Sequence, residues 1–188
     1  MAAWSASLET VAHLRNLLAA ARQLSLLDSD EREALRAVSR HVARENTRPR
    51  RSPGVDPTAR ISPFASLRFV ERVEIGPRAT LNPYACVWGG WREAWARVGA
   101  GALIGTGTVL VAGNHNIDPA GPVRDQRFEE SDVSVGAGTM IAANAVVIGC
   151  RVGADAVIGA NAVVTHDIPD RAIAVGVPAR VIGERRSA

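Results

Sequence analysis

The sequence is poor in aromatic residues and contains no lysine, so its core and surface must be built from a restricted set of side chains. Aromatic residues make up 4% of its 188 residues, and all 22 basic side chains are arginine. Ala, Val, Ile and Leu must therefore fill the core. The net charge of +3 is modest. No dense basic face with interleaved aromatics is visible, which argues against a nucleic-acid partner.

Cysteine and long apolar runs are also scarce. Cys86 and Cys150 are the only two cysteines, which cannot build a disulfide framework and lack the spacing of a metal site. The apolar runs are far shorter than a membrane span. The N-terminus lacks the basic and then apolar segments of a signal peptide. We therefore expect a cytoplasmic protein without a metal or a membrane span.

The first 46 residues have a helical pattern. Asp28 stands three residues before Glu31, a capping signal for a helix over the following residues. The sequence thus predicts an N-terminal α-helical hairpin over 1–46 and a basic, Pro-rich linker over 47–54. An apolar stripe at helical spacing marks the first helix: Leu8, Val11, Leu14, Leu17, Leu18, Ala21 and Leu24.

From Val55 onward the helical period gives way to a period of six. An aliphatic residue is followed four positions later by Ala or Thr, and Gly often follows the aliphatic residue directly. Repeats of six residues are typical of a parallel β-helix, and we place this domain at 55–183. The pairs are Val55/Ala59, Ile61/Ala65, Ile75/Ala79, Leu81/Ala85, Val98/Ala102, Ile104/Thr108, Val135/Thr139, Ile141/Ala145, Val152/Ala156 and Ile158/Ala162.

Three such hexads make one triangular turn of about 18 residues, whose short strands stack on the next turn at about 4.7–4.8 Å. The aliphatic residue should point into the prism, and the small residue should face inward near a corner. We expect the Gly residues to relieve backbone strain where the chain turns.

The repeat is first interrupted after Val87, where three of the four tryptophans occur within residues 88–95. Trp88 opens this segment. Tryptophan rings stack on sugars and other flat ligands, but they also seal coil edges and subunit interfaces. The sequence leaves both roles open, with packing favoured and Trp88 retained as a candidate acceptor contact.

The second interruption is a polar loop near 112–132 that begins with Gly113-Asn114-His115. A loop of this length inside a compact repeat is typically functional or disordered. His115 stands at its root, whereas His166 lies beyond the last regular hexads. His115 is therefore the candidate general base.

Two C-terminal motifs resemble the hexapeptide-repeat acyltransferases, especially the galactoside, maltose and colanic-acid-type O-acetyltransferases. They are the stretch from Val157 to Pro169 and the stretch from Gly176 to Ile182. The Asn114-His115 pair matches the family's catalytic segment. The resemblance covers about 54–183 and implies a mainly β fold, a single-stranded left-handed parallel β-helix. It also implies a homotrimer that binds the CoA thioester acetyl-CoA.

The resemblance assigns roles residue by residue. His115 corresponds to the general base, and Asn82 to an asparagine that contacts the acceptor. Asp118 is a weaker candidate, at the acceptor or as the group that orients His115. The coenzyme positions are Ala143, Ala160, Thr165, His166 and Arg180.

Two departures from the family pattern affect the coenzyme site. His166 stands where many relatives have Lys, which makes that phosphate contact weaker or pH-dependent. Met140-Ile141-Ala142 stands where many relatives have Trp-Ile-Gly, so the side chains beside the pantetheine arm differ from those of the family.

The resemblance implies acyl transfer to a small acceptor, with a saccharide hydroxyl favoured and direct transfer in a ternary complex. Cys86 and Cys150 are expected to be small buried hydrophobes rather than nucleophiles. Three alternatives remain: an amino-sugar N-acetyltransferase, a serine-type acetyltransferase and a non-catalytic scaffold. A γ-class carbonic anhydrase needs three histidines at its metal, and the repeat contains only His115 and His166.

Overall fold

The computed structural model describes residues 25–118 and 121–185. The chain divides into two compact units, Met1–His41 and Val42–Ala188, which are described separately. In the described part of the chain, no helix is both long and apolar enough to cross a membrane.

The helix α2 (Ser29–Val42) begins at the predicted capping signal. The Glu31 amide donates to Asp28 Oδ1 at 2.8 Å, and the Asp28 amide donates to Glu31 Oε2 at 3.0 Å. This reciprocal pair satisfies two amides that the first helical turn leaves without a backbone acceptor. The second predicted helix is therefore present, while the first, with its stripe from Leu8 to Leu24, lies outside the described residues.

The border between the units falls between His41 and Val42, whereas the sequence placed it after residue 46, with a linker over 47–54. After the border, the chain forms the π-helix η1 (Ala43–Thr47) and the 3₁₀ turn η2 (Pro49–Arg51). Asn46 is 2% exposed, and its amide donates at 2.8 Å to the carbonyls of Ser62 and Ala65. These carbonyls belong to the first turn of the β-domain, so Asn46 covers backbone groups that no earlier turn can pair.

Glu45 is held beside Asn46 by side chains of the β-domain. Its carboxylate accepts from Arg68 Nε at 2.6 Å and from Ser66 Oγ at 2.9 Å. Burial opposes ionisation of Glu45, but the hydrogen bonds from Arg68 and Ser66, with Arg44, outweigh it and lower the pKa. Glu45 and Asn46, which the sequence assigned to the helical hairpin, thus form a packed N-terminal cap on the β-domain, whereas most of the predicted linker over 47–54 is exposed.

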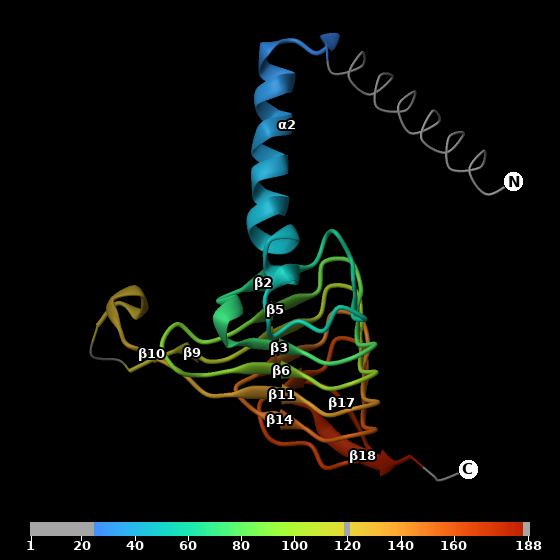
Figure 1. The fold of residues 1–188 in the computed structure, drawn as a ribbon. Helices are drawn as coiled ribbons and strands as arrows, with labels where there is room; N and C mark the ends of the chain where they lie inside the picture. The colour runs from blue at the N-terminus through green and yellow to red at the C-terminus, as the bar shows by residue number, and fades with distance from the viewer. Residues whose placement is uncertain (1–24, 119–120, 186–188) are drawn as a thin grey trace, which may run out of the picture. The chain divides into compact units, whose positions relative to one another are not determined.

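The second unit is a parallel coil with three sides (Figure 1). The chain visits a seven-stranded sheet, a five-stranded sheet and a four-stranded sheet in that order, and then begins the next turn. We call these the first, second and third sides. The first side holds β1 (Arg60–Ile61), β4 (Thr80–Leu81), β7 (Leu103–Ile104), β12 (Met140–Ile141), β15 (Val157–Ile158), β17 (Ala172–Val175) and β18 (Arg180–Glu184). The second holds β2 (Ser66–Arg68), β5 (Cys86–Trp88), β8 (Val109–Val111), β13 (Val146–Ile148) and β16 (Val163–Val164). The third holds β3 (Val73–Ile75), β6 (Ala96–Val98), β11 (Val133–Val135) and β14 (Arg151–Val152).

The hexad pattern correctly predicts the interior of this coil. Equivalent residues of successive turns are in register: Leu81 pairs with Ile104, which pairs with Ile141, which pairs with Ile158. All the aliphatic residues of the predicted pairs are buried, as are their small partners except Ala59, which is partly buried. The Thr139 hydroxyl, 1% exposed, donates to the Gly153 carbonyl at 2.6 Å. A hydroxyl is therefore tolerated inside because the neighbouring turn supplies an acceptor.

The expectation that the repeat glycines relieve backbone strain where the chain turns is wrong. The glycine that follows an aliphatic residue sits where the next turn comes closest: a Cβ on Gly99 would lie 2.5 Å from the amide nitrogen of Ala137. The left-handed backbone instead falls three positions after the aliphatic residue in most turns. The residues there are Arg78, Tyr84, Gly101, Gly107, Gly138, Asn144, Asp155, Asn161 and Arg171. The glycines that directly follow the aliphatic residues are therefore required because successive coils of the backbone approach closely, not because the chain changes direction there.

The C-terminal end of the coil is closed by an antiparallel pair, β17 with β18. Asp170 precedes this pair, and its Oδ1 accepts from the Ala154 amide at 2.9 Å and from Arg151 Nη2 at 2.8 Å. These bonds lower the pKa of Asp170. Beyond Asp170, β17 still stacks in parallel on β15, and the parallel order ends only at β18.

Gly99→Ala should lower the free energy of unfolding by about 1–3 kcal/mol, because the added methyl group would meet backbone of the next turn. Gly183→Ala is the matched control, since a Cβ there has no neighbouring atom within 4 Å. Urea unfolding of both variants measures the difference. Equal stabilities would contradict the close-approach explanation.

Glu45→Gln should lower the free energy of unfolding at neutral pH by about 1–3 kcal/mol, because it weakens hydrogen bonds to an ionised carboxylate. The folded-state pKa of Glu45 is lowered, so its stabilisation is present above the unfolded pKa and is lost as the pH falls through the lower folded value. Urea unfolding from pH 7 to pH 3 should show the wild type and the variant converging. A constant difference over that range would argue against an ionised Glu45.

Candidate functional site

The long interruptions of the hexad repeat occur at one corner of the coil, between the second and third sides. The first contains the 3₁₀ turn η3 (Val70–Arg72), which connects β2 to β3. The second is residues 89–95, which we call the tryptophan loop, between Trp88 at the end of β5 and the start of β6. The third lies between β8 and β11 and contains β9 (Asn114–His115), η4 (Val123–Asp125) and β10 (Phe128–Glu129). Successive turns therefore add irregular segments at the same edge of the prism.

His115 lies on an antiparallel hairpin formed by β9 and β10, which we call the histidine hairpin. His115 pairs with Phe128, and Asn114 pairs with Glu129. The imidazole is exposed and meets the Phe128 ring edge-on, with centroids 5.3 Å apart. The ring contact restrains the imidazole on the side of Phe128, while its exposure leaves it accessible to a reacting hydroxyl.

The polar excursion beyond His115 is held by Gln126. The Gln126 side-chain amide donates to the carbonyl of Asp118 and, at 2.8 Å, to that of Gly121. The Asp118 amide donates to Asn116 Oδ1 at 3.1 Å. Asp118 thus lies three residues from His115 on a loop clamped by Gln126. Its expected role at the acceptor or as the group that orients His115 stays a prediction.

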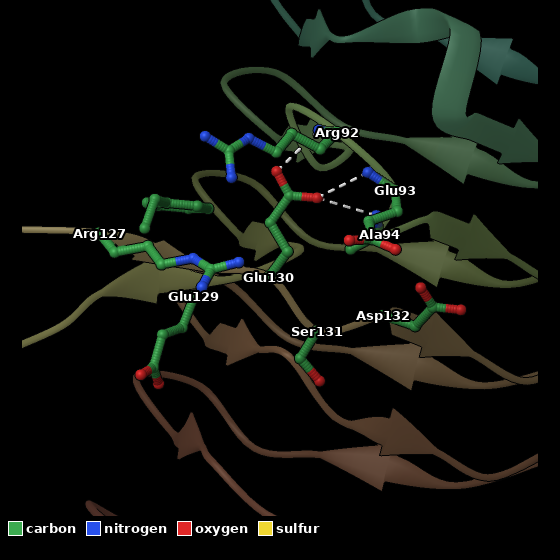
Figure 2. Close-up of a pocket in the computed structure, with 9 residues that line it drawn as sticks. Arg92, Glu93, Ala94, Arg127, Glu129, Glu130, Ser131 and Asp132 are labelled. Atoms are coloured by element: carbon green, nitrogen blue, oxygen red, sulfur yellow. Dashed lines mark hydrogen bonds between the residues drawn. The ribbon is translucent and has the colours of Figure 1, made fainter.

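Glu130 joins the segment after β10 to the tryptophan loop. Its Oε1 accepts from the Arg92 amide at 2.7 Å, and its Oε2 accepts from the amides of Glu93 at 2.8 Å and Ala94 at 3.0 Å (Figure 2). Burial opposes ionisation, but these backbone donors, together with that of Trp91, lower the pKa of Glu130. Sequence reasoning did not single out Glu130, since its partners lie 36–38 residues earlier.

Asp132 makes a second connection between the same two turns. Its Oδ1 accepts from the Trp95 amide at 2.8 Å, and its Oδ2 accepts from Arg97 Nη1 at 2.6 Å. The Arg97 guanidinium also lies 5.1 Å from the centroid of the Trp95 ring. Burial opposes ionisation of Asp132, but the Trp95 amide and Arg97 outweigh it and lower the pKa.

A polar cavity of about 560 Å³ lies between the tryptophan loop and the segment around β10 (Figure 2). Guanidinium and carboxylate groups dominate its wall, and Phe128 connects it to the edge of the His115 ring. Such a wall suits a hydroxylated or charged ligand better than an apolar one. The lining residues are Arg92, Glu93, Ala94, Arg127, Phe128, Glu129, Glu130, Ser131 and Asp132.

Trp88 and Asn82, expected at the acceptor, both have partners within the coil. Trp88 Nε1 donates to Ser66 Oγ at 3.1 Å, and the Arg68 guanidinium lies 4.9 Å from its ring centroid. These contacts match the packing role that the sequence left open. The Asn82 amide donates to the Ile104 carbonyl at 3.0 Å, at the corner between the first and second sides. One chain therefore places Asn82 and His115 at different corners.

Ala143 and Ala160, expected at the coenzyme, occupy equivalent positions of successive turns where the first side passes into the second. Both are exposed, and the Asn161 amide donates to the Ala143 carbonyl at 3.0 Å. Asn144 and Asn161 follow them with φ of 58° each. This corner thus presents a regular, exposed ladder of small residues.

The other expected coenzyme residues lie at the C-terminal end of the coil. Thr165 and His166 follow β16, and Thr165 Oγ1 lies 3.0 Å from His166 Nδ1. Arg180 begins β18 and is exposed, with its Nη1 donating to the Ala179 carbonyl at 2.9 Å. The Ala179 amide in turn donates to the Val163 carbonyl at 2.8 Å. Their exposure leaves side-chain donors available to a ligand along this end.

Neither cysteine has the environment of a nucleophile. Cys150 is 7% exposed, and burial raises the pKa of its thiol to about 11. Burial also raises the pKa of Cys86. Both thiols therefore stay protonated at neutral pH. The expected burial holds for Cys150, whereas Cys86 is only partly buried. Among residues 25–118 and 121–185, no group of three or more His, Cys, Asp or Glu side chains could hold a metal ion.

Comparison with known proteins found one curated relative in Mycobacterium tuberculosis, described as probable acetyltransferase Rv3034c. It is 32% identical over 123 residues, which cover 64% of this chain and 38% of the relative. The match therefore spans well under half of that relative's length. No family model matches the sequence.

Solved structures match a larger share of the chain. The hexapeptide-repeat acetyltransferase VCA0836 of Vibrio cholerae, in complex with acetyl-CoA, has a TM-score of 0.61 and 24% identity, over 94% of this chain and 91% of its own. A maltose O-acetyltransferase of Clostridium difficile has a TM-score of 0.60 and 21% identity, over 88% of this chain and 82% of its own. The resemblance found in the sequence is confirmed, and this chain has the fold of the hexapeptide-repeat acetyltransferases.

Proposed function

We propose that this protein transfers an acyl group, acetyl from acetyl-CoA, to a hydroxyl of a small acceptor, with His115 as general base. The observation that carries the proposal is the exposed imidazole of His115, on a hairpin beside a polar cavity of about 560 Å³. The similarity in fold to an acetyltransferase that binds acetyl-CoA supports the choice of donor.

In the proposed reaction, the neutral imidazole of His115 takes the proton of the acceptor hydroxyl as its oxygen attacks the thioester carbon. The tetrahedral intermediate then collapses, the C–S bond breaks, and the CoA thiolate takes up a proton. General-base catalysis of this kind contributes about 10²–10⁴-fold. Backbone N–H groups of an adjacent turn would stabilise the negative oxygen of the intermediate. The protonated thiols of Cys86 and Cys150 argue against an acyl-enzyme and for direct transfer in a ternary complex.

We assign the acyl-CoA arm to the exposed corner of Ala143 and Ala160, where backbone groups can bind the pantetheine amides. Thr165, His166 and Arg180 would then lie toward the phosphates. All five residues are exposed, so a ligand can reach them. The His166 ring, beside the Thr165 hydroxyl, would offer a nitrogen to the phosphate.

For the acceptor, the charged and polar wall of the cavity favours a saccharide or a related hydroxyl compound. Hydroxyl groups exchange hydrogen bonds with both carboxylates and guanidinium groups. Asp118 and Asn82 are retained as acceptor contacts. The contacts of Trp88 with Ser66 and Arg68 make it a packing residue first.

We further propose a left-handed coil that assembles as a homotrimer, with sites between neighbouring subunits. Apolar side chains on the outer surfaces of two sides support an assembly: Leu103 (40% exposed) and Met140 (39%) lie on the first side, and the half-buried Val109 and Val146 lie on the second. The third side instead carries ion pairs, such as Arg97 with Glu74 at 3.3 Å. A shared site would also bring the Asn82 corner of one subunit toward His115 of another. The free cysteines suit a reducing compartment such as the cytoplasm.

The alternatives differ in the nucleophile or in whether there is a reaction. An amino-sugar N-acetyltransferase and a serine-type acetyltransferase would use the same base on an amine or on a seryl hydroxyl. A scaffold would release no CoA thiol with any acceptor. A panel of sugars, amino sugars, sugar nucleotides and serine, each with acetyl-CoA, distinguishes these possibilities by thiol release and by the mass of the product.

His115→Ala should lower kcat by about 10²–10⁴-fold, because the acceptor hydroxyl loses its base. The KM for acetyl-CoA should stay near the wild-type value, since the proposed coenzyme residues lie on other strands. Thiol release with the best acceptor of the panel measures both constants. His41→Ala, an exposed histidine of α2, is the control. An unchanged kcat in His115→Ala would refute the assignment.

Light scattering should give a solution mass three times the chain's 19.9 kDa. A charge placed in an apolar subunit interface costs several kcal/mol. The assembly should therefore dissociate on Leu103→Arg on the first side, on Val109→Arg on the second, or on the two changes together. Ser134→Arg, on the third side, should leave the mass unchanged. A monomeric or dimeric wild type would contradict the proposed trimer.

A further inference from the structure

We propose that Glu130 is a positioning residue that fixes the tryptophan loop against the histidine hairpin and thereby shapes the acceptor side of the site. This inference rests on the proposed function. It adds a residue that neither the repeat pattern nor the family resemblance assigned.

Several backbone amides converge on the carboxylate of Glu130. Three consecutive amides, those of Arg92, Glu93 and Ala94, point at the two oxygens of Glu130 over 2.7–3.0 Å. A run of backbone N–H groups aimed at one point forms an anion-binding nest. Here a side chain of the same protein fills the nest, as the converging dashed lines in Figure 2 show.

The tryptophan loop depends on the Glu130 carboxylate for its shape. Residues 91–94 belong to no strand, so their amides lack the ladder partners of the coil. The Gly90 amide closes the loop on the Ala94 carbonyl at 2.7 Å. A Cβ on Gly90 would lie 2.6 Å from Glu130 Oε2. It would also lie 2.8 Å from the Ala94 carbonyl oxygen, so the loop is packed closely on itself and on the carboxylate at this point.

A short stretch of packed backbone connects Glu130 to the strand that carries His115. Glu130 directly follows Glu129, which pairs with Asn114 on the strand that carries His115. Gly113, at the base of the hairpin, packs against the Glu129 carbonyl, and a Cβ there would lie 2.6 Å from the Phe128 ring. A shift at Glu130 is therefore passed through tightly packed backbone to the histidine hairpin.

Asp132 does not duplicate this function. It binds the Trp95 amide and Arg97, which lie at the start of β6, where the regular coil resumes. The Val133 amide already donates to the Trp95 carbonyl at 2.8 Å. Asp132 thus supports the coil itself, whereas Glu130 holds the segment that projects from it.

The contacts of Glu130 should therefore affect binding of the acceptor and not binding of the coenzyme. Arg92 and Glu93 form one wall of the cavity, and Arg127 and Phe128 form the other. Glu130 sets the spacing between these walls. The residues assigned to the coenzyme, such as Ala160 and Arg180, lie on strands and corners that Glu130 does not contact.

Glu130→Ala should raise the acceptor KM by about tenfold or more, because charge-assisted hydrogen bonds are lost and the loop moves. The KM for acetyl-CoA should stay within about twofold. Glu130→Gln keeps one oxygen acceptor and should give an intermediate acceptor KM. Amide hydrogen exchange, followed by mass spectrometry on the wild type and both variants, should show faster exchange in peptides covering 89–95 and 113–118.

Glu184→Gln is the control variant. Glu184 lies in β18 at the C-terminal end of the coil, is paired with Arg171 at 3.3 Å and has a side chain 69% exposed. The change removes the same charge away from the tryptophan loop, and we expect wild-type kinetics and wild-type exchange in the two peptides.

The outcomes separate the proposal from the proposed function. Unchanged exchange in Glu130→Ala, faster exchange with an unchanged acceptor KM, or an equal rise in both KM values would each overturn the positioning role. A wild type that transfers no acyl group to any acceptor would overturn the proposed function and the role of Glu130 at the acceptor side together. The exchange result would still decide whether Glu130 joins the loop to the hairpin.

Discussion

The structure depends on the close, in-register stacking of one turn of backbone on the next. Parallel hydrogen bonds connect equivalent residues on all three sides, and the column Leu81, Ile104, Ile141 and Ile158 fills the interior with side chains of similar size. The spacing between turns leaves no room for a side chain where Gly99 faces Ala137. Because each turn is the template for the next, an irregular segment can leave the coil only at a corner. The tryptophan loop and the histidine hairpin do so at the same corner.

This regularity explains why the sequence predicts the coil so well. A residue such as Ile104 meets the same surroundings as its equivalents one turn away, so one local rule of spacing repeats along the chain. The capping signal of Asp28 and Glu31 is equally local, because both hydrogen bonds span three residues. His115 could be selected because it stands at the root of the longest break in the repeat.

The parts that the sequence did not predict depend on partners far along the chain. The sequence assigned Asn46 to the helical hairpin, because nothing near it in the chain shows that its amide donates to carbonyls 16 and 19 residues later. Glu130 looks like one of several surface carboxylates until its amide donors are seen 36–38 residues before it. The glycine rule was recognised as a pattern but explained by the wrong force, since spacing in a sequence does not distinguish a turn from a close approach between layers.

The two ends of the coil also limit how the protein can grow. A stacked parallel sheet presents unpaired backbone groups at its first and last turns, and such edges can recruit further strands from other molecules. Asn46 occupies two of those carbonyls at one end, and the reversed direction of β18 interrupts the parallel stack at the other. A repeat that could in principle continue indefinitely is thereby given a fixed length, and end-to-end polymerisation into fibres is disfavoured.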